Sequence, residues 1–217
     1  MALTIKVYSD YVCPFCLLAE DQLEQAAAER DVIIEYRPFE LRPYPKPTLR
    51  PEDAYMQTNW AEKVYPLAEQ LGVKMVMPPF SPQPYTHLAF EGFQFAQEHG
   101  RGKAYNSRMY SAFFQDSLDI GSIDVLTRLA EELGLDGKAF RHALEQRTYQ
   151  EHHRKALHHA CEEAKITAAP TFVIGDTAVK WLIYKEQFLE AIDAELAKRQ
   201  RLERWSEGVS CHADGCY

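Results

Sequence analysis

The sequence has few cysteines, no block of basic residues and no long apolar run. Five of its 217 residues are cysteine, and two close pairs plus one single residue do not make the disulfide framework of a small secreted domain. The net formal charge is −8 without a cluster of Lys and Arg, which argues against a nucleic-acid partner. No apolar stretch approaches the ~20 residues that cross a bilayer, so we expect no membrane partner.

The N-terminal residues also lack the features of a secretory leader. Met1 to Val7 enter a strand-like pattern directly, without a basic region, a longer apolar region or a cleavage site. The sequence therefore predicts a cytoplasmic protein. Thiols are mostly reduced in that compartment, so a close pair of cysteines there indicates catalysis or metal binding rather than a structural crosslink.

The chain begins with the pattern of a strand, a helix and a second strand. The runs Leu3–Tyr8 and Val32–Phe39 are rich in β-forming residues, and Leu17–Arg30 between them carries apolar residues at helical spacing. A βαβ unit has parallel strands joined by a right-handed crossover. At 46% hydrophobic residues, the chain can also bury a sizeable core.

Strand patterns return only near the C-terminus. The runs Thr171–Gly175 and Ala178–Leu182 surround a turn and predict a hairpin, and a helix is expected from Lys185 to Trp205.

The region between these ends is predicted to be helical. A proline-rich linker at 42–51 precedes it. The expected helices cover 52–71, 84–99, 103–115, 122–133, 136–146 and 148–165. Ser122 is the expected N-cap of the fourth, and Thr148 with Glu151 forms a capping-box pattern for the sixth.

This order predicts an α/β chain with a thioredoxin-like fold, in which a helical domain is inserted between the βαβ and ββα halves. The expected divisions are a thioredoxin-like domain at 1–42 and 166–205, an inserted helical domain at 43–165, and a mobile cysteine-containing tail at 206–217.

Cys13-Pro-Phe-Cys16 stands where the first strand gives way to the first helix. Unpaired backbone N–H groups and the helix dipole favour an anion at a helix start, so Cys13 is the expected attacking thiolate, exposed to substrate. Cys16 lies one turn later and is expected to face inward as the resolving thiol. Pro14 suits the first turn because it has no N–H group to lose.

Ala169-Pro170-Thr171 precedes the third predicted strand, in the loop that faces the cysteine pair in a thioredoxin-like fold. A cis bond at Pro170 would leave the backbone groups of Ala169 free to pair with an extended substrate. A proline at a strand entry is also common without any function, but its combination with the cysteine pair favours the substrate-binding interpretation.

The stretches Ser9–Cys16 and Ala168–Gly175, with the helical insertion between them, resemble the DsbA-like thioredoxin superfamily. Within it, the chain is most similar to the cytoplasmic FrnE-type branch, which is related to 2-hydroxychromene-2-carboxylate isomerases. The resemblance implies thiol–disulfide exchange on protein or peptide substrates, without a bound cofactor, although glutathione could serve as a redox partner. By position, it implies Cys13 as nucleophile, Cys16 as resolving thiol, and Pro170, Ala169, Pro14 and Phe15 as substrate-binding residues.

Two features depart from relatives of this branch. Glu20 and Asp21 stand where basic residues are frequent, and we interpret them as a solvated helix face, although a Glu20 near Cys13 would oppose thiolate formation. Lys180-Trp-Leu-Ile183 replaces a stretch of small residues and could form an apolar substrate surface or simply pack in the core.

Cys211 and Cys216 form a second pair in the tail and could exchange with Cys13–Cys16 as an accessory redox pair, or have no role. Together the two pairs could also hold zinc, and so could His152, His153, His158 and His159 with Cys161. The strand-to-helix position of the first pair suits redox chemistry better. For the histidines we prefer a polar helix stripe, with Cys161 as a small core residue, and therefore expect no metal site.

Aromatic residues crowd 80–114 at helical spacing and indicate the core of the helical insertion, with some of them available to line a groove over the dithiol. Two other functions remain open from the sequence. Glutathione-dependent isomerases and kappa-type transferases share the expected architecture but typically carry serine at the position of Cys13. A non-enzymatic adaptor would use the insertion to bind its partner and would not need the thiols.

Overall fold

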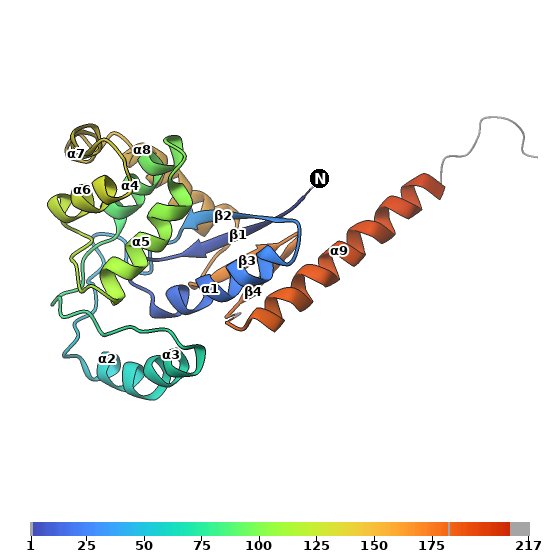
Figure 1. Cartoon of the computed structure of the whole chain (residues 1–217), viewed down its shortest axis with the longest axis horizontal. Coiled ribbons are helices and arrows are strands. Elements are labelled where there is room, and N and C mark those ends of the chain that lie inside the picture. The colour runs from blue at the N-terminus through green and yellow to red at the C-terminus, as the bar shows by residue number, and fades with distance from the viewer. Residues whose placement is uncertain (1, 182, 209–217) are drawn as a thin grey trace, which may run out of the picture.

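A mixed β-sheet forms the centre of the molecule. The computed structural model describes residues 2–181 and 183–208, and within them the sheet has the strand order β2-β1-β3-β4 (Figure 1). Strand β1 pairs with β2 in parallel and with β3 in antiparallel orientation, and β3 continues into a hairpin with β4. The strands are β1 (Leu3–Ser9), β2 (Val32–Pro38), β3 (Thr171–Ile174) and β4 (Thr177–Lys180). This confirms the predicted thioredoxin-like fold.

Two helices pack against each other beside the sheet. Helix α1 (Pro14–Ala28) connects the parallel strands, and α9 (Lys185–Gly208) follows the hairpin. The C-terminal part of α9 projects away from the rest of the molecule (Figure 1). The helix extends to Gly208, three residues beyond its predicted end at Trp205, and the mobility of the tail stays a prediction. Residues 209–217 of that predicted tail lie outside the described residues.

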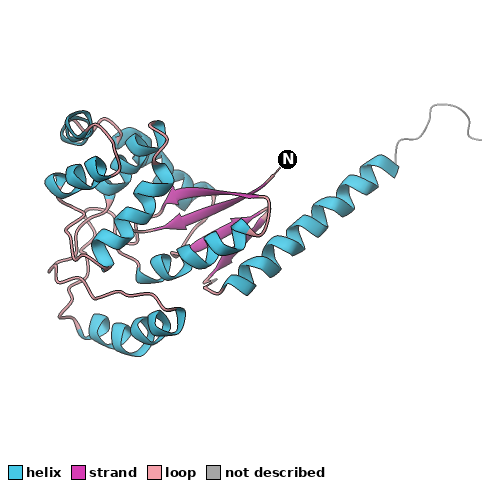
Figure 2. Cartoon of the chain, in the orientation of Figure 1, coloured by secondary structure: helices cyan, strands magenta, loops and turns pink. Residues whose placement is uncertain are grey.

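The segment between β2 and β3 is helical, as predicted, and its helices gather at one end of the sheet (Figure 2). The expected capping box was wrong: Tyr149, not Thr148, caps the last of these helices. Ser122 is an N-cap by position but makes no side-chain capping bond. The helices are α2 (Ala54–Asn59), α3 (Tyr65–Leu71), α4 (His87–Glu98), α5 (Gly102–Phe114), α6 (Ile123–Glu132), α7 (Gly137–Glu145) and α8 (Gln150–His158), with π-helical segments at Trp60–Val64 and His159–Glu163.

The described residues form two hydrophobic cores. The smaller core lies between the sheet and helices α1 and α9. Its members include Leu3 and Ile5 of β1 and Phe188 and Ile192 of α9. The larger core joins the helical segment to the start of α1, and its members include both Cys13 and Cys16. Most aromatic residues of 80–114 are buried in it, which confirms the sequence interpretation. The division into two domains stays a prediction.

The larger core also fixes the loop between β1 and α1. Tyr11 in this loop is fully buried and stacks on Phe90 of α4, with 4.4 Å between ring centroids. It makes an edge contact with Tyr110 of α5 at 5.3 Å. Because buried aromatic residues contribute about 1.5–3 kcal/mol of stability each, this packing holds the loop firmly against the helices. None of the described helices is long and apolar enough to cross a membrane.

Candidate active site

Cys13 and Cys16 lie at the N-terminal end of α1. Cys13 is the N-cap residue, Pro14 opens the helix, and the Cys16 N–H donates to the Cys13 carbonyl at 3.0 Å. Both thiols are free, and each residue is only 4% exposed. The expected inward position of Cys16 is confirmed, but the expected exposure of Cys13 was wrong, because the loop before β3 lies against it.

That loop is the Ala169–Pro170 segment. Its peptide bond is cis, as expected from the sequence. The Cys13 thiol donates to the Ala169 carbonyl, with 3.6 Å between Sγ and O, and Pro170 itself is buried. The tertiary structure therefore brings together residues 156 positions apart in the sequence, and the backbone of Ala169 directly contacts the reactive sulfur.

Cys16 occupies a low-polarity environment. Burial raises the pKa of its thiol well above the ordinary value, and the neighbouring Cys13 raises it further. It lines a small cavity together with Glu20, Tyr110 and Pro170. Cys16 is therefore held as a protonated thiol, which suits a resolving group that reacts only after a mixed disulfide has formed beside it.

The prediction that Glu20 belongs to a solvated helix face was wrong. Glu20 lines the same small cavity as Cys16, and its carboxylate accepts hydrogen bonds from Asn106 Nδ2 at 2.6 Å and Ser107 Oγ at 3.0 Å. Burial raises the pKa of Glu20 to about 7. The reason is the inserted segment, since α5 covers this face of α1, whereas Asp21 on the next position is exposed.

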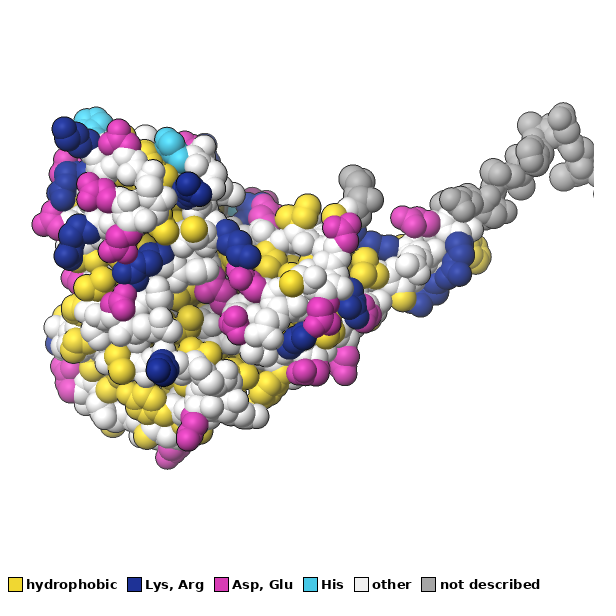
Figure 3. All heavy atoms as spheres, viewed as in Figure 1, with side chains coloured by type: hydrophobic (Ala, Val, Ile, Leu, Met, Phe, Trp, Pro, Cys, Tyr) yellow, Lys and Arg dark blue, Asp and Glu magenta, His cyan; other side chains and the backbone are white. Residues whose placement is uncertain are grey.

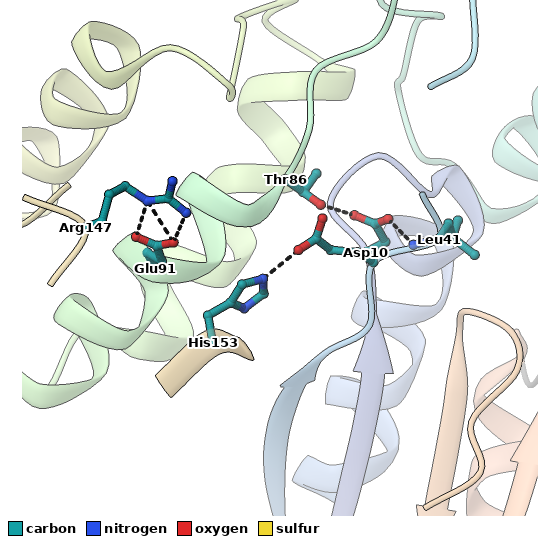
Figure 4. A network of polar contacts seen from close by, with 7 residues as sticks. Asp10, Leu41, Thr86, Glu91, Arg147 and His153 are labelled. Carbon is teal, nitrogen blue, oxygen red and sulfur yellow. Dashed lines mark hydrogen bonds and ion pairs between the residues drawn. The ribbon is translucent and has the colours of Figure 1, made fainter. Parts of the chain in front are cut away.

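Asp10 is a second buried acid, three residues before Cys13. Its side chain Oδ2 accepts the Leu41 N–H at 2.8 Å, and Oδ1 accepts the Thr86 hydroxyl at 2.8 Å (Figure 4). Its backbone carbonyl accepts the Cys13 N–H at 3.0 Å. Burial raises the pKa of Asp10 to about 6. Asp10 has no role among the predictions from sequence, although an acid three residues before Cys13, in a mostly apolar stretch, was a signal for one.

Phe15 and Trp181 lie on the outer side of the dithiol. Phe15, between the two cysteines, is partly buried and meets Trp181 edge to face at 5.7 Å. Trp181 is 51% exposed and adopts a left-handed backbone with φ of 63°. Residues other than glycine rarely adopt this conformation, and where they do it is often at a functional site. Of the two interpretations that the sequence left open for 180–183, exposure favours a surface role for Trp181.

More exposed apolar residues lie close to this side. Figure 3 shows hydrophobic side chains gathered over the lobe formed by α2 and α3. This lobe contains the exposed Tyr55 and Tyr65, and α3 contacts α1. Tyr184, just after the hairpin, reaches it through a hydrogen bond to Gln70 at 3.2 Å.

The other cysteines and the histidines do not join this site. Among the residues that the structure describes, no group of three or more His, Cys, Asp or Glu side chains could hold a metal ion. His153 is buried and contacts Glu40 at 2.6 Å, so the histidines do not form a uniform polar stripe. Cys161 is exposed rather than part of the core. Cys211 and Cys216 lie outside the described residues.

Comparisons with known proteins agree with the resemblance. A family model described as the DSBA-like thioredoxin domain matches residues 4–195. The chain is 53% identical to the protein YwbO of Bacillus subtilis over 200 residues, which cover 92% of this chain and 100% of that protein.

Solved structures show the same fold at low sequence identity. A probable DsbA oxidoreductase of Streptomyces coelicolor has a TM-score of 0.76 at 22% identity and covers 91% of each chain. A 2-hydroxychromene-2-carboxylate isomerase has a TM-score of 0.69 at 20% identity, over 96% of this chain and 100% of the other. The cytosolic disulfide reductase DsbM of Pseudomonas aeruginosa, solved with GSH, has a TM-score of 0.63 at 19% identity, over 93% and 100%.

Proposed function

The chain belongs to the DsbA-like thioredoxin family, and from that premise we propose that it catalyses thiol–disulfide exchange through Cys13 and Cys16. The observation that carries the proposal is the contact of Cys13 Sγ with the Ala169 carbonyl at the start of α1, with Cys16 buried one turn behind it. An attacking thiol, a protected thiol and a backbone segment beside the attacking sulfur are the three parts that such an exchange needs.

The exchange proceeds in two balanced steps. The Cys13 thiolate attacks one sulfur of a substrate disulfide, forms a mixed disulfide and releases the other substrate sulfur as a thiolate, which takes a proton from water. Cys16 then loses its proton and attacks Cys13 Sγ, which releases the second substrate thiol and leaves the Cys13–Cys16 disulfide. A substrate dithiol reverses both steps and is itself oxidised.

Proteins or peptides are the proposed substrates. The Ala169 backbone lies beside the reacting sulfur, where an extended chain could pair with it, while Phe15 and Trp181 offer aromatic surface for an apolar side chain next to the substrate cysteine. Pro14 would contact the same chain. Glutathione is a proposed small redox partner, supported by the fold shared with the GSH-bound reductase DsbM. A cytoplasmic location and the FrnE-type branch belong to the same proposal.

The test is the reduction of insulin disulfides by the full chain with glutathione as electron donor. Cys13→Ser should abolish turnover, whereas Cys161→Ser, which removes an exposed thiol elsewhere, should leave it unchanged. Full activity of Cys13→Ser would disprove the function. The double variant Cys211→Ser/Cys216→Ser, assayed alongside, tests the proposed accessory pair. If this pair relays electrons to or from Cys13, oxidation of Cys13 should be slower in the double variant than in the wild-type protein.

A further inference from the structure

Helix α9 extends well beyond the part of the molecule against which its N-terminal half packs. Phe188 and Ile192 are fully buried in the smaller core, whereas residues 200–205 are all exposed. Figure 1 shows this C-terminal half projecting away from the sheet and its helices. The helix has 24 residues, which at 1.5 Å per residue makes it roughly 36 Å long. A large part of its surface therefore has no partner in one copy of the chain.

The solvent-facing side of α9 carries charges of opposite sign at its two ends. Residues at spacings of three and four share one face of a helix, and one such series runs along the side opposite Phe188 and Ile192. All of its members are exposed or partly exposed: Glu186, Glu190, Ala194, Ala197, Arg201 and Arg204. We call this series the charged stripe. It begins with two acids, passes two alanines and ends with two cations.

The four charged residues of this stripe have no ion pair within the residues that the structure describes. Arg204 donates to the Gln200 carbonyl of its own helix at 3.3 Å. The other described cations of α9 contact carboxylates of the same chain: Lys185 contacts Glu29, Lys198 contacts Asp176, and Arg199 contacts Glu195. The charges of the stripe are therefore available to a partner, whereas those beside it are already used within the fold.

A second copy of this chain matches both ends of the charged stripe at once. When two α9 helices pack antiparallel about a twofold axis, Glu190 of each copy lies opposite Arg201 of the other. In the same register, Glu186 lies opposite Arg204. The two alanines of each stripe then meet at the centre, where their small side chains allow the helices to approach closely.

Other kinds of partner fit only one end of the stripe. An anionic lipid surface attracts the basic end but repels the acidic end of the same face. An acidic protein meets the same conflict, and a basic protein meets the opposite one. Both ends are matched by a partner that carries the same charges in reverse order, and a second α9 in antiparallel orientation is such a partner.

We propose that the charged stripe of α9 is an interface through which two copies of the chain associate as an antiparallel pair of helices. The proposal does not depend on the exchange function. One helix from each copy makes a small interface, of the class below about 1,200 Å² that supports weak association. The formal charge of −8 on each copy also opposes their approach. The dimer therefore forms reversibly and depends on protein concentration.

The experiment follows the oligomeric state of the full chain by sedimentation velocity, over a concentration series that reaches about 0.3 mM. The wild-type protein should pass from monomer to dimer within this series. Arg201→Glu/Arg204→Glu replaces the four attractive contacts of the dimer by repulsive ones and should weaken dimerisation at least about tenfold. Glu186→Arg/Glu190→Arg should disrupt the same contacts from the acidic end.

The matched control is Arg128→Glu/Lys138→Glu. It reverses two exposed cations of α6 and α7 and changes the net charge by the same amount as Arg201→Glu/Arg204→Glu, so it should dimerise like the wild type. Equal dimerisation of Arg201→Glu/Arg204→Glu and the wild type would overturn the proposal. Equal weakening by this variant and by the control would overturn it too, because net charge rather than the stripe would then govern association.

A mixture of the two reversed variants gives the sharpest test. In a mixed dimer every glutamate of the stripe again faces an arginine, so the mixture should dimerise within a few-fold of the wild type although neither variant does so alone. A mixture that stays monomeric would show that the stripe is not the interface. A wild-type chain that stays monomeric throughout the series would overturn the proposal without any variant, whether or not the variants fold.

Vesicles of phosphatidylserine and phosphatidylcholine test the competing occupant. If the wild-type chain is monomeric and sediments with these vesicles, and Arg201→Glu/Arg204→Glu does not, the stripe binds lipid and the proposal is wrong. The insulin assay separates this proposal from the exchange function, because Arg201→Glu/Arg204→Glu should keep the turnover of the wild type while it loses the dimer. Loss of turnover in this variant would contradict an interface that only joins two copies.

Discussion

The inner and outer sides of the Cys13–Cys16 pair are built from different kinds of residue. On the inner side, the carboxyl group of Asp10 is buried and that of Glu20 is partly buried, and both are bonded to groups of the linker and the helical segment. On the outer side, Phe15 and Trp181 present aromatic surface, half of it exposed in the case of Trp181.

The difference indicates a division of roles. Charges in a low-dielectric environment control which protonation states of the thiols are stable, so the inner side should govern equilibria and stability. Exposed aromatic surface contributes binding energy when a partner covers it, so the outer side should govern substrate affinity. Variants on the two sides should therefore change different measurements.

The largest expected effect comes from Cys16 itself. Cys16→Ser removes the intramolecular thiol that resolves the mixed disulfide, and an external thiol at millimolar concentration cannot replace it. Turnover in the insulin assay should fall by about 100-fold or more, with mixed disulfides on Cys13 detectable by mass spectrometry. Normal turnover without trapped species would show that Cys16 is not the resolving group.

Glu20→Gln should change stability and its pH dependence. Burial raises the folded-state pKa of Glu20 from 4.5 to about 7. Below the unfolded-state pKa the carboxyl group is protonated in both states and does not reduce the stability of the protein. As the pH rises from the unfolded-state pKa toward the folded-state pKa, the unfolded state ionises first, and the folded protein loses stability. The substitution keeps an acceptor for Asn106 and Ser107 but removes the buried charge. At pH 8 it should therefore stabilise the protein by on the order of 3 kcal/mol, measured by urea unfolding.

The matched control for this measurement is Asp21→Asn, which should leave the pH dependence of stability unchanged. Equal pH profiles of stability for wild type and Glu20→Gln would mean that the Glu20 carboxylate is solvated. Glu20 would then not support the difference between the inner and outer sides of the dithiol.

The smallest expected effect is on the outer side. Trp181→Ala should raise KM for a peptide substrate with an apolar residue beside its cysteine by about 5-fold, equivalent to ~1 kcal/mol of lost aromatic contact. The value of kcat and the glutathione equilibrium should remain unchanged. Trp205→Ala, on the projecting part of α9, removes an indole that is 76% exposed and is the control. Equal KM values in the two variants would contradict a substrate-binding role for Trp181.

Local patterns in the sequence were sufficient for the strands, most helix positions and the two cysteines. The alternation of Leu3, Ile5 and Val7 and the position of Pro14 after Cys13 are properties of neighbouring residues, and the same residues determine the elements in the structure. The Ala169–Pro170 loop was also predictable, because the order of elements places it opposite the cysteines.

The environment of the dithiol was decided only by the tertiary structure. Glu20 and Asp21 are adjacent acids with the same helical propensity, yet α5 covers only Glu20. Asp10 owes its burial to Leu41 and Thr86, which lie 31 and 76 positions away in the sequence. Burial and the pKa of a group depend on what packs over it, and for Cys13–Cys16 that covering comes from distant segments. The sequence alone determined which atoms could react, whereas the packing of the helical segment decided which charges surround them.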